Sequence, residues 1–263
     1  MQPHFLRIGS VYVYTYGVLL VVAFAVAMWL AARAAREWPA SAGVLTPSQV
    51  GEWGSVAMLG GLIGGRAWYV LQYWDVFKHQ PLEILAIWHG GLVWYGGFLG
   101  GVVATWGFVR GKRLTLRRVL DQVIPFVALS HAIGRVGCFL NGCCYGKPTI
   151  PGFGVVFPQH PDELRIPTQL LEAAALVGLY VMLRMRQRPQ MLTRPGRLFG
   201  IYLVGYAAVR FVLEFFRGDQ TASWGPLTIP QVVSVVVAVV AGFLLMVQWG
   251  RHDQSASFKR GPA

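Results

Sequence analysis

Apolar stretches long enough to cross a lipid bilayer recur along this chain. A membrane span needs about 20 mostly apolar residues, and seven windows of the sequence meet that requirement: 16–35, 52–73, 92–110, 119–139, 168–186, 198–217 and 229–249. Only 13% of the residues are charged, whereas soluble domains carry about 25%. No shift in composition divides the chain. The sequence therefore predicts an all-α polytopic membrane protein with about seven transmembrane helices, forming one membrane domain over 1–250 with a short polar tail over 251–263.

Basic residues fall into four clusters between or after these windows. The clusters are Arg33 and Arg36; Arg110, Lys112, Arg113, Arg117 and Arg118; Arg184, Arg186, Arg188, Arg194 and Arg197; and Arg251, Lys259 and Arg260. If the chain crosses the membrane seven times, all four lie on one side, which the positive-inside rule makes cytoplasmic. We therefore expect a periplasmic N-terminus and a cytoplasmic C-terminus. Topology and anionic lipid account for the formal net charge of +12, so we expect no nucleic-acid partner.

Two windows contain glycines at four-residue spacing, in "GGLIGG" (60–65) and "GGFLGG" (96–101). Such spacing is typical of helices whose backbones approach closely. The alternative is a backbone left bare to contact a lipid headgroup. We expect close helix packing.

Outside the four basic clusters, three arginines lie well inside predicted spans: Arg66, Arg135 and Arg210. Each costs about 2.5–3.5 kcal/mol on insertion scales, and the predicted topology puts all three in the outer half of the bilayer. One explanation is snorkelling, which suits Arg217 at a helix end better than the deeper three. Another is a structural ion pair, such as Arg210 with Glu214 four residues later. The functional explanation is a cationic pocket for an anionic lipid headgroup.

Six segments of the sequence resemble the phosphatidylglycerol–prolipoprotein diacylglyceryl transferase family, nearly end to end. They are "YTYGVLL" (14–20), "GGRAWYVLQY" (64–73), "GGLVWYGGFLGG" (90–101), "GRVGCFLNGCCYG" (134–146), "RIPTQLLE" (165–172) and "GYAAVRFVLEFFR" (205–217). The resemblance implies a multi-pass enzyme of the bacterial cytoplasmic (inner) membrane. It would move a diacylglyceryl group from phosphatidylglycerol to the lipobox cysteine thiol of prolipoproteins. The expected partners are phosphatidylglycerol, prolipoprotein signal peptides and membrane lipid, with the protein a monomer.

The reaction that the resemblance implies needs positive charge, because negative charge develops on the departing phosphate. Guanidinium groups suit a phosphate since they bind it bidentately and keep their charge. On the positions that match the family's motifs, the expected catalytic residues are Arg135, Arg210, Glu214 and Cys143. The expected substrate-binding residues are Tyr16, Arg66, Tyr95, Cys138, Asn141, Gly146, Glu172 and Tyr206. Arg66 is a supporting or structural residue, and each glutamate either acts as a general base or orients an arginine.

The chain departs from the family at several of these positions. The family usually has asparagine where this chain has Cys138, glutamate where it has Cys143, and histidine where it has Tyr95. All three cysteines of the chain lie within 138–144. Four readings remain open: small inert replacements, a disulfide, a metal site with His131, and an enzyme thiol that takes the lipid before passing it on. The spacing matches no familiar zinc pattern, so we expect the cysteines to shape the pocket, with no metal ligand and no cofactor.

Two rival functions accompany the transferase. The first is a related membrane enzyme that uses its own cysteine nucleophile on another lipid or acceptor. The second is a non-enzymatic phospholipid-binding or transport protein with the same arginine pocket. In all three cases the segment 139–167, rich in proline and glycine, is expected to form an outer cap over the pocket.

Overall fold

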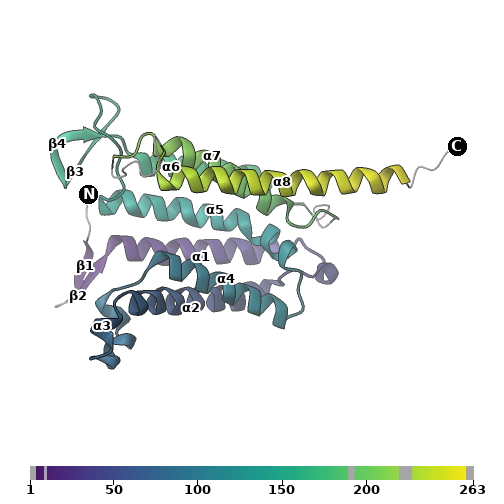
Figure 1. The fold of residues 1–263 in the computed structure, drawn as a ribbon, viewed down its shortest axis with the longest axis horizontal. Helices are drawn as coiled ribbons and strands as arrows, with labels where there is room; N and C mark the ends of the chain where they lie inside the picture. The colour runs from purple at the N-terminus through teal and green to yellow at the C-terminus, as the bar shows by residue number, and fades with distance from the viewer. Residues whose placement is uncertain (1–3, 9–10, 189–192, 219–226, 259–263) are drawn as a thin grey trace. The chain divides into compact units, whose positions relative to one another are not determined.

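Seven long helices lie where the sequence predicts membrane spans. The computed structural model describes residues 4–8, 11–188, 193–218 and 227–258. The long helices are α1 (Thr15–Ala35), α2 (Pro47–Gln72), α4 (Trp94–Gly111), α5 (Leu116–Asn141), α6 (Thr168–Arg186), α7 (Arg197–Glu214) and α8 (Ile229–Phe258) (Figure 1). Each overlaps one predicted window and agrees with it to within a few residues at most ends. The exception is α8, which continues as helix into the predicted polar tail; Lys259 and Arg260 lie outside the described residues.

Four of these helices are long and apolar enough, by length and composition, to cross a membrane: α1, α5, α6 and the Ile229–Val247 portion of α8. The described residues of α2, α4 and α7 do not combine the same hydropathy with so few charges, since glycines, aromatic residues and charged residues interrupt their apolar sequences. Large hydrophobic side chains are exposed on the helices, among them Val21, Trp29, Phe243 and Met246. A mostly helical membrane protein accounts for this, because lipid would cover such faces.

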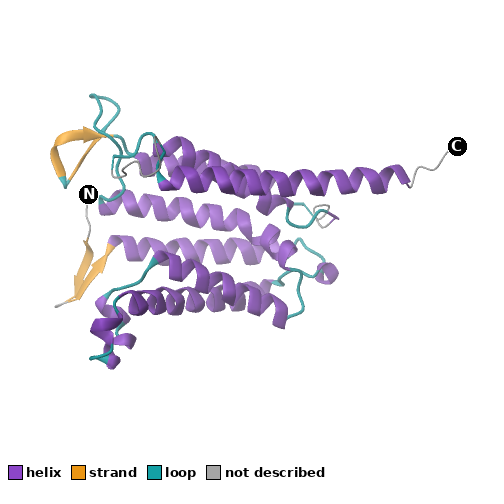
Figure 2. Ribbon diagram, in the orientation of Figure 1, coloured by secondary structure: helices purple, strands orange, loops and turns teal. Residues whose placement is uncertain are grey.

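The remaining elements are short. Helix α3 (Trp74–Phe77) and three 3-10 helices, η1 (Ala40–Ala42), η2 (Pro81–Leu85) and η3 (Ile87–His89), lie in connections. Strands β1 (His4–Ile8) and β2 (Val11–Tyr14) form one antiparallel pair, and β3 (Val155–Phe157) and β4 (His160–Arg165) form another (Figure 2). The all-α prediction missed both pairs because strands of three to six residues carry little periodic signal. The second pair lies within the predicted cap segment.

The chain divides into two compact parts, and each is described by itself. One contains Ala31–Val119 and the other Met1–Leu30 with Leu120–Ala263. In the Ala31–Val119 part, helices α2 and α4 pack backbone to backbone through their glycines. A Cβ added at Gly64 would lie 2.3 Å from the carbonyl oxygen of Gly96, and one added at Gly100 would lie 2.2 Å from that of Gly60. The prediction of close helix packing is therefore confirmed.

Helix α2 begins with a capping box. The Thr46 hydroxyl accepts a hydrogen bond from the main-chain N–H of Gln49 at 3.3 Å, while the main-chain N–H of Thr46 donates to Gln49 Oε1 at 3.0 Å. Pro47 occupies the first helical position, where its missing N–H has no consequence. These three residues fix the start of α2.

In the other part, helices α5, α6 and α7 share an apolar core. It consists of Ile124, Ala128, Leu179, Leu183, Leu198 and Tyr202. At one end of this part, the Gln187 side-chain amide donates to the main-chain oxygens of Asp121 at 3.0 Å and Gln122 at 2.7 Å. The Asp121 carboxylate caps α7 by accepting from the N–H groups of Gly196 at 2.6 Å and Phe199 at 2.8 Å. The start of α5, the end of α6 and the start of α7 therefore meet at this end.

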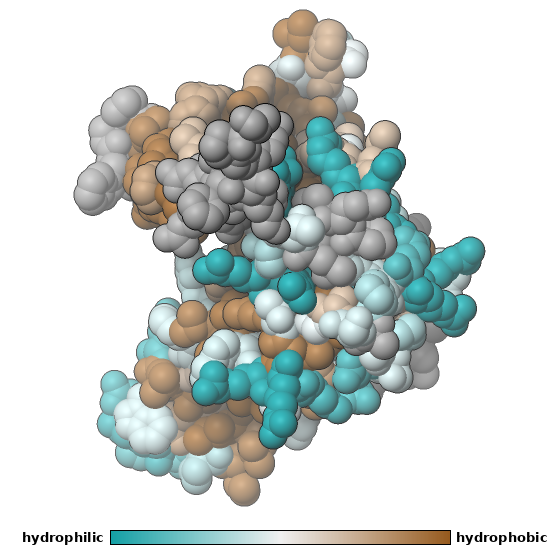
Figure 3. Space-filling view, turned by 90° about the vertical axis from the view of Figure 1, so that its right-hand side faces the viewer, coloured by the Kyte–Doolittle hydropathy of each residue, from teal (hydrophilic) through white to brown (hydrophobic). Residues whose placement is uncertain are grey.

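Exposed basic side chains lie at or next to the ends of α1, α4, α5 and α6. They include Arg36, Lys112, Arg113, Arg117 and Arg186. Figure 3, coloured by hydropathy, shows both hydrophilic and hydrophobic residues on the surface turned to the viewer.

Candidate functional site

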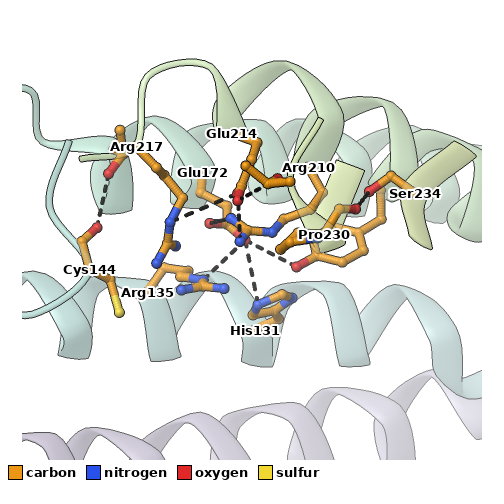
Figure 4. Close-up of polar contacts among 12 residues, drawn as sticks. His131, Arg135, Cys144, Glu172, Arg210, Glu214, Arg217, Pro230 and Ser234 are labelled. Carbon is orange, nitrogen blue, oxygen red and sulfur yellow. Dashed lines mark hydrogen bonds and ion pairs between the residues drawn. The ribbon is translucent and has the colours of Figure 1, made fainter. Parts of the chain in front are cut away.

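Three arginines and two glutamates form a chain of ion pairs at the opposite end of the α5–α7 core. Arg135 Nε lies 3.0 Å from Glu172 Oε1, and Arg210 Nη1 lies 4.0 Å from Glu172 Oε2. Arg210 Nη2 lies 2.8 Å from Glu214 Oε2, and Arg217 Nε lies 3.9 Å from the same oxygen (Figure 4). We call these five residues the arginine–glutamate cluster. Three guanidinium groups face two carboxylates, so the cluster has an excess of one positive charge.

Antiparallel helices bring the cluster together. Arg135 lies near the end of α5, Glu172 near the start of α6, and Arg210 and Glu214 near the end of α7. Because successive helices run in opposite directions, late residues of α5 and α7 meet early residues of α6. These contacts bring Arg135 and Arg210 together with both glutamates, while the depth of the arginines in the bilayer stays a prediction.

The carboxylates of the cluster are buried more completely than Arg135 and Arg210. The Glu172 and Glu214 side chains are 3% and 0% exposed, while those of Arg135 and Arg210 are 17% and 14% exposed. Charges removed from water interact strongly and require partners. Arg135 and Arg210 are therefore the two arginines of the cluster whose side chains keep the most exposure.

Arg217 corrects the sequence interpretation. Snorkelling would carry its charge into water, but the residue is only 7% exposed and pairs with Glu214. The signal for this pairing is present in the sequence, since Glu214 precedes Arg217 by three residues and such pairs meet on a helix surface. Arg217 is thus a member of the cluster that sequence reasoning missed.

Two hydroxyl groups also form hydrogen bonds with the carboxylates of Glu172 and Glu214. Tyr206 donates its phenolic hydrogen to Glu172 Oε1 at 3.1 Å, and Thr228 donates its hydroxyl to Glu214 Oε1 at 3.0 Å. His131 Nε2 lies 3.8 Å from Glu172 Oε1, and the histidine ring meets the Tyr206 ring edge to face. Thr228 was not predicted as a site residue, because a threonine before a helix is ordinarily read as an N-cap. Both glutamates are engaged on both oxygens, which suits carboxylates that orient arginines.

The three cysteines gather beside this cluster, at the end of α5. They are free thiols, and their Sγ atoms all lie within 4.8 Å of one another. The Sγ atoms of Cys143 and Cys144 are 3.7 Å apart. Among the described residues this group of possible ligand atoms consists of the three sulfurs and does not include His131. The structure therefore separates His131 from the thiols, contrary to the reading that joined them in one metal site.

Residues at the start of α6 fix the main chain of the loop that follows α5 and carries Cys143 and Cys144, called the cysteine loop below. The Gln169 amide donates to the carbonyl oxygen of Cys143 at 2.6 Å, and the Thr168 hydroxyl donates to that of Cys144 at 2.9 Å. Hydrogen bonds with the Cys138 and Cys143 thiols lower the pKa of the Cys144 thiol, and the guanidinium groups of Arg217 and Arg135 act in the same direction.

Three further predicted residues lie near this end of the same part. The Tyr16 ring covers Gly137, where an added Cβ would lie 3.2 Å from Tyr16 Cδ2, and Asn141 is the last residue of α5. The N–H of Gly146 donates to Ile166 O at 2.8 Å. A Cβ at Gly146 would lie 2.7 Å from the carbonyl oxygen of Phe216, so this glycine permits close backbone packing between the loop and the end of α7.

Arg66 and Tyr95 belong to the Ala31–Val119 part. Arg66 donates from Nε to Ile84 O at 2.9 Å, from Nη1 to Gly90 O at 2.7 Å and from Nη2 to Glu83 O. It is 7% exposed and fixes the connection between α2 and α4, as a structural residue would. Tyr95, in the first turn of α4, is 66% exposed and packs edge to face against Trp94.

Comparison with known proteins finds a close match over almost the whole chain. The family model described as "Prolipoprotein diacylglyceryl transferase" matches residues 3–247. A protein of Coxiella burnetii named phosphatidylglycerol–prolipoprotein diacylglyceryl transferase is 34% identical over 97% of this chain and 97% of its own length. Proteins of the same name from Pseudoalteromonas atlantica and Cupriavidus metallidurans are 36% and 33% identical over 82% of this chain, covering 76% and 80% of their own lengths.

Proposed function

The chain belongs to the prolipoprotein diacylglyceryl transferase family, and we propose that its arginine–glutamate cluster binds the phosphate of phosphatidylglycerol during transfer. It is a membrane transferase of lipoprotein maturation, moving a diacylglyceryl group from phosphatidylglycerol to the cysteine thiol of a prolipoprotein. Since the family is one of enzymes, the non-enzymatic lipid-binding alternative is not retained.

The reaction sets the demand that the cluster meets. The acceptor sulfur attacks the glyceryl carbon that carries the phosphate ester, a C–S bond forms, and the C–O bond breaks. Glycerol phosphate leaves with the electron pair of that bond, so negative charge grows on the phosphate. Fixed positive charge in a site shielded from water stabilises such a transition state. The observation that carries the proposal is that Arg135 and Arg210 are held side by side by the buried carboxylates of Glu172 and Glu214.

We assign different tasks to the members of the cluster. Arg135 and Arg210 contact the phosphate, because their side chains are less buried than those of the glutamates and of Arg217. Glu172 and Glu214 hold these arginines in place, and Tyr206 holds Glu172. Both carboxylates already have partners on both oxygens, so neither is assigned as the general base of the resting site.

The remaining predicted site residues are proposed as supporting groups. Tyr16 and Asn141 line the headgroup side of the pocket in the part that carries the cluster. Arg66 supports the connection between α2 and α4, and Tyr95 contacts substrate from the exposed start of α4. Gly146 keeps the cysteine loop against the end of α7.

The proposed topology has seven spans with a periplasmic N-terminus, a cytoplasmic C-terminus and a monomeric membrane domain over 1–250, followed by the tail 251–263. The coincidence of seven long helices with seven predicted windows supports it. Segment 139–167 is proposed as the outer cap. Its attachment to the end of α7, where Gly146 bridges to Arg217, supports a position next to the phosphate site.

One assay tests the transferase directly. Purified protein, phosphatidylglycerol and a lipobox peptide should yield a peptide whose cysteine carries a diacylglyceryl thioether, detected by mass spectrometry. A peptide with serine in place of that cysteine is the control and should stay unmodified. If the cysteine peptide also stays unmodified with protein that is folded and inserted, the proposal is wrong.

A second candidate is an enzyme that first transfers the lipid to its own thiol, and the three free cysteines beside the cluster are the observation behind it. We expect no such intermediate, because the acceptor already supplies a thiol. Intact-mass measurement after incubation with phosphatidylglycerol and no acceptor decides between the two. A diacylglyceryl or acyl adduct that disappears, together with activity, in a single Cys→Ser variant would favour the second candidate.

A further inference from the structure

Every thiol of this protein lies in one group. The chain has three cysteines, and the fold brings Cys138, Cys143 and Cys144 to within 4.8 Å of one another, sulfur to sulfur. None is fully buried. The sequence spacing alone suggested no zinc pattern, because the last turn of α5 separates Cys138 from the other two along the chain. The loop after α5 turns back and brings Cys143 and Cys144 next to Cys138.

The distances suit a small thiophilic cation. Zinc holds thiolates at about 2.3 Å in a tetrahedron, which places neighbouring sulfurs about 3.8 Å apart. The Sγ atoms of Cys143 and Cys144 are 3.7 Å apart. Cys138, on the last turn of α5, needs only a side-chain rotation to complete a face of that tetrahedron, because its Sγ already lies within 4.8 Å of both.

The loop that carries two of the sulfurs is fixed before any ion binds. Gln169 and Thr168 bond the carbonyl groups of Cys143 and Cys144, and the N–H of Cys143 donates to Cys138 O at 3.1 Å. Such second contacts keep ligand atoms in place and raise metal affinity.

The neighbouring charges would also balance such a site. Three thiolates with a divalent cation carry one net negative charge, which the guanidinium groups of Arg217 and Arg135 would offset. Figure 4 shows Cys144 at the same end of the close-up as these two arginines. Three protein ligands leave the fourth tetrahedral position open, as catalytic zinc sites do.

We propose that Cys138, Cys143 and Cys144 bind one zinc ion as thiolates and that the acceptor's lipobox sulfur takes the fourth position. The proposal rests on the transferase function and says how the acceptor is activated. A thiol that coordinates zinc loses its proton, here to solvent, and is held as a thiolate beside the arginine–glutamate cluster. That sulfur forms the new C–S bond as the C–O bond to phosphate breaks. The thioether product is a weaker ligand and leaves, and zinc keeps its oxidation state throughout.

Metal analysis tests binding without reference to activity. The full-length protein, purified in detergent with zinc supplied, should contain about one zinc per chain by elemental analysis, as a three-thiolate site requires. Replacement by cobalt should give a thiolate-to-cobalt charge-transfer band and the intense visible bands of a tetrahedral site. Because the chain has no other thiol, these bands report on this group alone.

Single substitutions locate the ligands. Cys138→Ser, Cys143→Ser and Cys144→Ser should each lower zinc content and weaken the charge-transfer band. His160→Gln is the matched control. It removes an imidazole from the same cap segment, where it bonds the Tyr145 hydroxyl at 2.8 Å, and should leave both readings unchanged. Zinc content that is absent in the unmodified protein, or unchanged in all three serine variants, overturns the proposal.

The acceptor provides the last test. A lipobox peptide with cysteine should shift the visible cobalt bands, and the serine peptide should not. Chelation should abolish thioether formation, and added zinc should restore it. Full transfer by metal-free protein overturns the zinc site and leaves the transferase function standing. A cobalt site that responds to the peptide in protein that makes no thioether supports the zinc site and counts against the transferase function.

Discussion

At the scale of single residues, the arginine–glutamate cluster combines two properties that rarely occur together. Its carboxylates are almost wholly buried, while Arg135 and Arg210 keep partial exposure. A buried carboxylate is costly unless it is paired, and each of the two glutamates is paired with an arginine. The glutamates thereby hold both arginines in position for an anionic ligand.

Removal of the guanidinium group of either Arg135 or Arg210 should stop the reaction. We expect Arg135→Ala and Arg210→Ala each to lower the rate of transfer by at least about 10²-fold, the usual cost of losing one group that stabilises developing charge. Lysine at either position should restore little, since a point charge does not reproduce the bidentate fork. Thioether formation by purified, membrane-inserted variants measures this. Full activity in an alanine variant would remove that arginine from the site.

Glu214 should matter for stability as well as for orientation. Glu214→Ala leaves Arg210 and Arg217 without their shared carboxylate, and breaking a buried pair costs about 3–5 kcal/mol. Thr228→Val is the matched control, because it removes only one hydrogen bond to the same carboxylate, worth about 1 kcal/mol. Thermal unfolding in detergent should rank the wild type first, Thr228→Val second and Glu214→Ala last. Equal stability of the two variants would contradict this view of Glu214.

At the scale of helices, glycine decides how α2 and α4 pack. The glycine backbones stand so close that no side chain fits between them, as the contact of Gly64 with Gly96 and that of Gly60 with Gly100 require. The same glycines lower the hydropathy of both helices, which explains why neither ranks among the most apolar spans. The glycines thus lower the hydropathy of α2 and α4 and at the same time allow the two helices to pack closely.

A pair of substitutions in α2 separates packing from helix propensity. Gly64→Ala should destabilise the protein by roughly 1–3 kcal/mol, because its Cβ would meet the Gly96 carbonyl oxygen at 2.3 Å. Gly51→Ala, in the same helix with open space around the added Cβ, should be neutral or stabilising by roughly 0.5–1 kcal/mol. Thermal unfolding and the yield of inserted protein measure both. A tolerated alanine at Gly64 would show that the two helices can separate without loss.

At the scale of the whole molecule, the predicted orientation makes a direct experiment possible. Reporter fusions after residues 113, 190 and 255 should all report a cytoplasmic location, because each position lies within a basic cluster. A fusion within the segment 149–153 should report the periplasm. A periplasmic signal from any of the first three would contradict the topology, and with it the placement of the phosphate site in the outer half of the bilayer.

The sequence alone determined the helices, the family and the two arginines that are proposed to contact phosphate. Helices are local: their apolar stretches are read from neighbouring residues, and each motif is a run of the chain. The sequence also suggested that Glu172 and Glu214 share a depth with Arg135 and Arg210, because position along antiparallel helices follows from counting residues.

The tertiary structure alone decided which side chains meet. Three such contacts depend on how each helix is rotated about its axis and on how the loops after α5 and α7 turn back. They are the buried pair of Arg217 with Glu214, the hydrogen bond from Thr228 to Glu214, and the approach of the three cysteine sulfurs to one another. Neither quantity is encoded in a short window of sequence, because both are set by packing between residues far apart in the chain. Tertiary structure likewise paired Arg66 with main-chain carbonyl groups of the connection between α2 and α4. Every residue has such a carbonyl group, so the sequence does not reveal these partners.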